Sequence, residues 1–225
     1  MGESLLVRKW RNAYDQEMLN ELILLRHGES EHLLEGVVGG WTDSALTPHG
    51  IDQAKQTSEF LAKYVPSSPL QIFTSDLKRA VQTTEWIAAR NGNEVVKTPL
   101  LRELNNGVAK GLSKVEAEKI WMPPTQPILD WIPYEGGESW RMLYTRIEQY
   151  MGYLATTSFE RIVIVSHANS IICIVNWWLG LSSDTHLQNI MYDIRPCSIT
   201  HLKRDKDGSS RLAKLNDVSH LTLLD

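Results

Sequence analysis

The sequence predicts an α/β fold, a three-layer sandwich in which a mostly parallel central sheet carries helices on both faces. Short apolar runs alternate with amphipathic helical patterns from Glu21 onward, as is typical of parallel strands joined by crossover helices. Two apolar runs end in polar pairs, Arg26-His27 and Ser166-His167. Ligands of open α/β sheets bind outside the carboxyl ends of the strands, so both pairs are expected at one site.

The first half of the chain contains three expected strands and two expected helices. Strands are predicted at 21–25, 71–74 and 94–97, where apolar residues cluster in short runs. Thr47 is a favourable N-cap and precedes a proline, so the first helix is expected to begin there. The second helix, from about 77 to 88, is expected to stop at Asn91-Gly92.

The second half continues the alternation after an interruption. The segment at about 105–137 is rich in proline, glycine and tryptophan, which predicts a small, loop-rich lid inserted over the same sheet edge. An amphipathic helix is expected from 140 to 154, a strand at 161–165 and a nearly all-apolar, buried helix at 171–179. The mixed-charge stretch 203–208 ends in Asp-Gly, which is typical of a solvated hairpin.

Length and composition favour one globular domain. We expect residues 21–225 of the 225 to form it, with 1–20 as an N-terminal extension. The net charge of −4 argues against a nucleic-acid partner. The chain contains no apolar run of the ~20 residues that a membrane span requires. Two cysteines are too few for a disulfide framework, so a cytoplasmic location is expected.

Arg26-His27-Gly28 is the sharpest chemical signal. The guanidinium offers a fork of donors to a tetrahedral oxyanion, and glycine lets backbone amides approach closely. A neutral imidazole carries a lone pair, so His27 is a candidate nucleophile. An ordinary surface Arg-His pair at a strand end accounts equally well for these three residues alone.

Other charged residues follow later strands and strengthen this hypothesis. Arg79 falls in the first turn of an expected helix, where the free amides and the helix dipole attract phosphate. Glu103 follows a strand, and His167 is a second histidine at a strand end. Metal binding is disfavoured: His27 and His32 lack a matching ligand cluster, and no metal or other cofactor is expected.

Six short motifs, in this order, resemble those of the histidine phosphatase superfamily, also called the phosphoglycerate mutase-like family. The resemblance extends from Leu22 to about Leu221. The motifs are Arg26-His27-Gly28-Glu29-Ser30, Leu46-Thr47-Pro48-His49-Gly50, Ser75-Asp76-Leu77-Lys78-Arg79-Ala80, Leu101-Arg102-Glu103, Gly137-Glu138-Ser139 and Val165-Ser166-His167.

The resemblance implies a role for each matching residue. His27 is the nucleophile that becomes phosphorylated, and Glu103 protonates the leaving oxygen and later deprotonates the attacking water. Arg26, Arg79 and His167 hold the phosphoryl oxygens. Further contacts to the phosphate are expected from Ser30, Gly39, Gly40, Ala168 and Asn169.

The phosphatase branch of the family is favoured over the mutases. Gly40-Trp41-Thr42-Asp43 and His167-Ala168-Asn169-Ser170 resemble mutase segments, but residues 122–135 lack the paired arginines of the mutase lid. The leading hypothesis is therefore a metal-independent phosphomonoesterase acting on a small phosphate ester. A phosphoglycerate-type mutase is the first alternative.

A phosphoester-binding regulatory protein with little turnover is the second alternative. Leu33 stands where many members have an asparagine that donates to the phosphate, and Ala168 replaces a common glycine. The lid tryptophans Trp121, Trp131 and Trp140 either pack the lid onto the sheet or line a pocket for apolar esters. The substrate and the oligomeric state, a homodimer included, are left open by the sequence.

Overall fold

The computed structural model describes residues 19–65, 71–89 and 94–221. Residues 1–18 of the expected extension and the Asn91-Gly92 stop signal lie outside them, so both expectations stay predictions. Within the described part, one six-stranded sheet forms in the order β3-β2-β4-β1-β5-β6. Its strands are β1 (Glu21–Arg26), β2 (Gln71–Ser75), β3 (Val95–Thr98), β4 (Arg161–Ser166), β5 (Ile199–Arg204) and β6 (Ser210–Asp217).

The sheet is parallel through its first four strands and antiparallel at one edge. β1 and β2 both pair in parallel with β4, and β3 pairs in parallel with β2. β5 runs antiparallel to β1, and β6 completes the predicted hairpin with β5. The expected mostly parallel sheet is confirmed.

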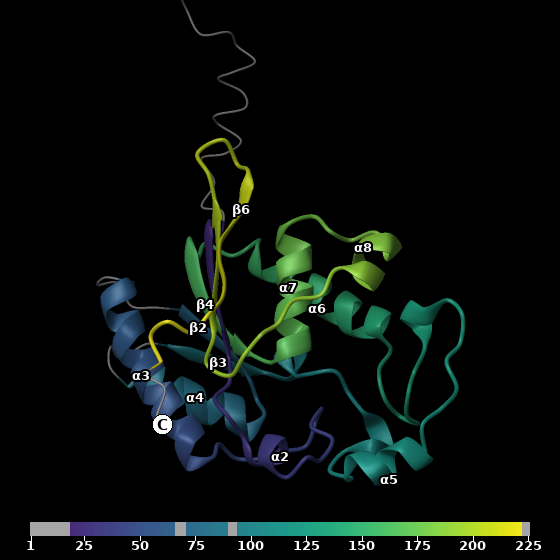
Figure 1. Ribbon diagram of the computed structural model, residues 1–225. Coiled ribbons are helices and arrows are strands. Elements are labelled where there is room, and N and C mark those ends of the chain that lie inside the picture. The colour runs from purple at the N-terminus through teal and green to yellow at the C-terminus, as the bar shows by residue number, and fades with distance from the viewer. Residues whose placement is uncertain (1–18, 66–70, 90–93, 222–225) are drawn as a thin grey trace, which may run out of the picture.

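Helices cover both faces of the sheet, which confirms the three-layer prediction (Figure 1). On one face lie α3 (Pro48–Tyr64) and α4 (Lys78–Ala88), and on the other lie α6 (Trp140–Leu154) and α7 (Ala168–Trp178). Alternate side chains of β1 enter two separate cores: Leu22 and Leu24 pack with α6 and α7, whereas Ile23 and Leu25 pack with α3 and α4. This alternation is the period-two pattern of a strand buried on both faces.

Several boundaries refine the sequence expectations. Thr47 caps α3 as predicted, since its hydroxyl accepts a hydrogen bond from the Gly50 amide at 2.9 Å. α7 begins at Ala168, three residues earlier than its apolar run suggested, because polar residues fill its first turn. Three short helices were not expected: α2 (Glu31–Leu34), α5 (Lys114–Lys119) and α8 (Asp184–Asn189).

The segment 105–137 extends from one end of the molecule, at the right in Figure 1. It is mainly loop but contains α5 and two short 3₁₀ helices, Gly107–Ala109 and Ile128–Asp130. Ser113 and Glu116 form a capping box at the start of α5. Their Ser-x-x-Glu spacing is a sequence signature that could have predicted this helix. None of the helices in the described residues is long and apolar enough to cross a membrane.

Two glycines allow the loop after β1 to lie directly on the start of α3. A Cβ on Gly28 would lie 2.5 Å from the Gly50 carbonyl oxygen, and a Cβ on Gly50 would lie 1.9 Å from the Glu29 carbonyl oxygen. Real Cβ atoms do not approach backbone oxygens this closely. The path of the chain on either side of His27 therefore depends on both glycines.

We predict that Gly50→Ala destabilises the protein although the residue lies in a helix. Alanine normally improves helix stability, but here the close contact with Glu29 should reverse the sign and cost about 1–3 kcal/mol. Urea denaturation measures the change. Gly152→Ala is the matched control, since no atom lies within 4 Å of its added Cβ. Equal stability of the two variants would contradict the close approach.

Candidate active site

The site lies where β1, β2 and β4 end. Arg26, the last residue of β1, pairs in register with Ser166, the last residue of β4. The His27 amide donates to the Ser166 carbonyl at 3.0 Å, and this bond aligns the residues that follow the two strands. The two histidine-bearing strand ends that the sequence identified are therefore adjacent, with their imidazole ring centres 5.0 Å apart.

His27 is almost fully buried and has one ring nitrogen fixed by the backbone. Its Nδ1 lies 2.7 Å from the Gly28 carbonyl oxygen, which can only accept, so Nδ1 carries the proton. The remaining nitrogen, Nε2, is therefore unprotonated and carries a lone pair in the neutral ring. This is the tautomer that a nucleophilic imidazole requires.

Arg79 brings its guanidinium to that lone pair. Its Nε donates to His27 Nε2 at 3.1 Å, while its two terminal nitrogens donate to the carbonyl oxygens of Thr42 and Gly40 at 2.6 and 2.8 Å. Arg79 is 1% exposed and belongs to the first turn of α4, as predicted. The carbonyls hold the guanidinium in place beside the imidazole.

Two buried polar atoms around His27 have no hydrogen-bond partner in the described part of the chain. One is Nε of Arg26, whose Nη1 is anchored on the Ile194 carbonyl at 2.5 Å. The other is Nδ1 of His167, whose Nε2 lies 2.8 Å from the Ser75 hydroxyl. Leaving such groups unpaired is costly, which is typical of atoms that a ligand satisfies.

Glu103 is half-buried and lies at the N-terminus of α7. One carboxylate oxygen accepts from the Leu104 amide at 2.9 Å and the other from the Asn169 amide at 3.3 Å. The Glu103 carbonyl is held by the Trp41 indole at 2.7 Å and by Arg146 at 3.2 Å. Asn169 therefore contacts Glu103 through its backbone rather than its side chain, and Ala168 precedes it in the first turn of α7.

The predicted phosphate contacts at Ser30, Gly39 and Gly40 lie on the other side of His27. The buried Ser30 hydroxyl is 3.0 Å from Nδ1 of His32. The Gly40 carbonyl accepts a hydrogen bond from Arg79 at 2.8 Å. Gly40 has a φ of +50°, which favours glycine. A Cβ on Gly39 would lie 2.6 Å from Nε2 of His32, so this glycine makes room for that imidazole.

Burial and mutual repulsion set the charge of the site. Burial, then Arg79 and Arg26, lower the pKa of His27 well below its usual value. Burial, then Arg79, His27 and Arg26, lower the pKa of His167 in the same way. Burial also lowers the pKa of Arg79 to about 10, although Glu103 opposes that shift. At neutral pH both histidines are neutral and both arginines are charged, so the site attracts an anion while the nucleophile stays unprotonated.

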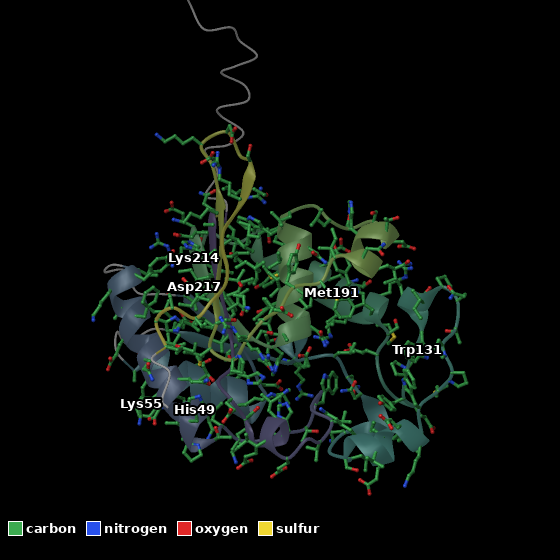
Figure 2. The ribbon with its side chains drawn as sticks, viewed as in Figure 1. His49, Lys55, Trp131, Met191, Lys214 and Asp217 are labelled. Carbon is green, nitrogen blue, oxygen red and sulfur yellow. The ribbon has the colours of Figure 1, made fainter. Side chains whose placement is uncertain are left out.

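A shallow hollow of about 330 Å³ adjoins Glu103. It is lined by Trp41, Asn105, Gly107, Val108, Lys110, Glu135 and Gly136. None of the three lid tryptophans lines it. Trp121 and Trp131 pack against each other with ring centres 5.1 Å apart, and Trp140 packs on the larger core. Figure 2 shows Trp131 within the 105–137 segment. Packing, rather than a pocket for apolar esters, accounts for them here.

Four supporting residues had no assigned role in the sequence interpretation. Ser75 binds the His167 ring, Ser44 binds the His32 ring, and the Thr83 hydroxyl accepts from the Gly28 amide at 3.1 Å. The Arg146 guanidinium donates to the Glu138 carboxylate and to the main-chain carbonyls of Arg102 and Glu103. Ser75 and Glu138 do fall in the quoted motifs, which was a usable signal. Thr83, Ser44 and Arg146 carry no local pattern that marks them.

Comparison with known proteins decides the family. A model of the histidine phosphatase superfamily (branch 1) matches residues 22–218. The chain belongs to this superfamily. The expected fold and family are thereby confirmed.

Relatives in the superfamily include both mutases and phosphatases. A 2,3-bisphosphoglycerate-dependent phosphoglycerate mutase of Methylorubrum extorquens is 31% identical over 177 residues, which cover 73% of this chain and 81% of the mutase. A mycobacterial glucosyl-3-phosphoglycerate phosphatase superimposes with a TM-score of 0.73 at 26% identity, covering 88% of this chain and 98% of that one. A phosphoserine phosphatase from Entamoeba histolytica gives 0.72 at 26% identity, covering 90% and 99%.

We predict that His27 stays neutral well below the pH at which an exposed histidine gains its proton. Because the pKa of His27 is lowered, the ring gains its proton only in more acidic solution. Its ring resonances should therefore keep their neutral-form shifts from about pH 7.5 to 5.5. Heteronuclear NMR of ring-labelled protein, assigned with His27→Gln, measures this. A His27 midpoint near the exposed value of about 6.5 would contradict the buried, cation-flanked geometry.

Proposed function

We propose that the protein is a metal-independent phosphomonoesterase that hydrolyses a small phosphate ester through a phosphohistidine on His27. One observation carries the proposal: the unprotonated Nε2 of His27 faces Arg79, and the unpartnered Nε of Arg26 and Nδ1 of His167 lie around the same ring. Phosphoryl transfer depends mainly on positioning and on positive charge around three oxygens. Two arginines and a histidine supply both.

The reaction proceeds in two steps at the same phosphorus. His27 Nε2 attacks the phosphorus, the bond to the ester oxygen breaks, and Glu103 gives that oxygen its proton. Water then attacks the phosphohistidine, Glu103 takes its proton, and the nitrogen–phosphorus bond breaks to release inorganic phosphate. Arg26, Arg79 and His167 hold the nonbridging oxygens throughout, with Ser30 and the backbone at Gly39, Gly40 and Ala168 as further contacts.

The position of Glu103 supports its role as the acid and base. Its carboxylate accepts from the Asn169 amide in the first turn of α7, and His167 immediately precedes that helix. The charges of Glu103 and of both arginines influence one another, so these groups lie close together. The carboxylate is therefore near the phosphoryl pocket, where a leaving oxygen or an attacking water can reach it.

The charges next to Glu103 favour hydrolysis over mutase chemistry. The charged residues lining the adjoining hollow are Lys110 and Glu135, which have opposite signs. Arg102, the nearest arginine in sequence, forms a bidentate pair with Asp76 and stacks on Trp41. A mutase must keep a second acidic group while the phosphoryl group moves, and Arg102, already engaged by Asp76, provides no spare guanidinium for it.

Phosphoglycerate mutase activity remains the second candidate because mutases are among the curated relatives at 31% identity. The phosphatase candidate draws similar support from a putative phosphoserine phosphatase of Hydrogenobacter thermophilus, 29% identical over 90% of this chain and 98% of that protein. A phosphorylated hydroxy acid or amino acid is accordingly the first substrate class to test.

The remaining proposals concern the setting of the enzyme. Cys173 and Cys197 are free and buried, which supports a reducing, cytoplasmic compartment. Among the described residues, no group of three or more histidine, cysteine or acidic side chains could hold a metal ion. Metal-independent turnover is proposed because Arg26 and Arg79 already supply positive charge to the phosphoryl group. The 105–137 segment is proposed as the lid, since its ends adjoin Glu103 and Glu138.

We predict phosphate release from p-nitrophenyl phosphate in the presence of EDTA, with loss of at least about a thousandfold in kcat/KM for His27→Ala. The loss follows because the proposal assigns the attacking lone pair to Nε2 of His27, which alanine lacks. His49→Ala is the control, because His49 is an exposed histidine on α3, labelled in Figure 2. Turnover that survives in His27→Ala, or that EDTA abolishes in the wild type, would contradict the proposal.

A further inference from the structure

His32 is a buried imidazole beside the nucleophile that the reaction just proposed does not use. It belongs to the short helix α2, where it is 7% exposed, whereas its neighbours Leu33 and Leu34 are 40% and 68% exposed. Its ring centre lies 6.2 Å from that of His27. The second ring is therefore a direct neighbour of the nucleophile.

Two serines fix the orientation of the His32 ring. Its Nδ1 lies 2.7 Å from the Ser44 hydroxyl and 3.0 Å from the Ser30 hydroxyl, so this nitrogen is engaged on the protein side. The other nitrogen, Nε2, lies against Gly39, where any side chain would collide with it. Gly39 is followed by Gly40, whose carbonyl holds Arg79, so the Nε2 edge of the ring lies against the turn that anchors this guanidinium.

The charge state of His32 suits a neutral hydrogen-bond donor. Burial, then Arg79 and Arg26, lower its pKa to about 4. At neutral pH it carries one ring proton, and a serine hydroxyl that donates to Nδ1 leaves this proton on Nε2. A neutral donor adds a hydrogen bond to the phosphate without bringing a third positive charge close to Arg26 and Arg79.

We propose that His32 Nε2–H is a phosphate-binding donor of this enzyme and supplies the hydrogen bond that Leu33 cannot. Leu33 occupies the position at which the family resemblance places an asparagine donor, and here its side chain is exposed and apolar. The imidazole of His32 fills the space that Gly39 leaves open, and the Ser44 hydroxyl fixes its orientation. The inference rests on the proposed phosphatase function, because it assigns one more contact to the same phosphoryl group.

Asparagine and glutamine substitutions identify the nitrogen that matters. The amide nitrogen of glutamine can occupy the position of Nε2, whereas that of asparagine reaches only as far as Nδ1. We expect His32→Gln to keep the inhibition constant of inorganic phosphate within about threefold of wild type. His32→Asn and His32→Phe should raise this constant about tenfold or more, since each loses a hydrogen bond to a charged group. KM should rise with it while kcat changes less.

The controls separate binding from folding and from failure of the parent proposal. Leu34→Ala changes an exposed residue of the same helix and should leave all constants unchanged, and urea denaturation reports whether each variant is folded. If His32→Asn retains phosphate binding and His32→Gln loses it, the nitrogen that matters is Nδ1, which contacts Ser30, and the proposal for Nε2 is overturned. Unchanged binding in folded His32→Phe also overturns it. Absence of wild-type turnover would instead refute the phosphatase function.

Discussion

The site depends on one constraint: a buried imidazole held between a carbonyl on one side and a guanidinium on the other. The Gly28 carbonyl fixes the proton of His27 on Nδ1, and Arg79 lies 3.1 Å from the opposite nitrogen. Burial disfavours the charged imidazole and Arg79 repels a second positive charge, so the pKa of His27 is lowered and the ring remains neutral. The same guanidinium that keeps the nucleophile unprotonated is therefore available to the phosphoryl oxygens.

The surrounding fold maintains this arrangement at the ends of three parallel strands. Arg26 and His27 continue β1, His167 follows β4, and Ser75 at the end of β2 binds the His167 ring. Burying two arginines requires partners, and main-chain carbonyls provide them: those of Thr42 and Gly40 for Arg79, and that of Ile194 for Arg26. Neutral carbonyls hold the guanidinium groups without cancelling their charge, which an ion pair would do.

Much of this could be predicted from the sequence, for identifiable reasons. β1 and β4 were recognisable as buried strands because their apolar runs stop abruptly at polar residues, and Thr47-Pro48 marked the start of α3. The approach of His27 and His167 followed from the rule that parallel strands end at one edge. The place of His32 could not be predicted, since its burial depends on Ser44 and on the space above Gly39, which no local pattern encodes. The lid tryptophans were ambiguous for the same reason, because the tilted contact between the Trp121 and Trp131 rings depends on how the 105–137 segment folds.

The most direct test of the account is to locate the phosphoryl group during turnover. Rapid mixing with a phosphate ester, followed by alkaline quench and peptide mass spectrometry, detects an acid-labile phosphohistidine and its position. The account predicts phosphorylation of His27 alone. With p-nitrophenyl phosphate, whose leaving group needs no proton from Glu103, it also predicts accumulation of that species in Glu103→Gln, in which water has no base. Turnover with no phosphoenzyme, or with the phosphoryl group on His167 or His32, would contradict it.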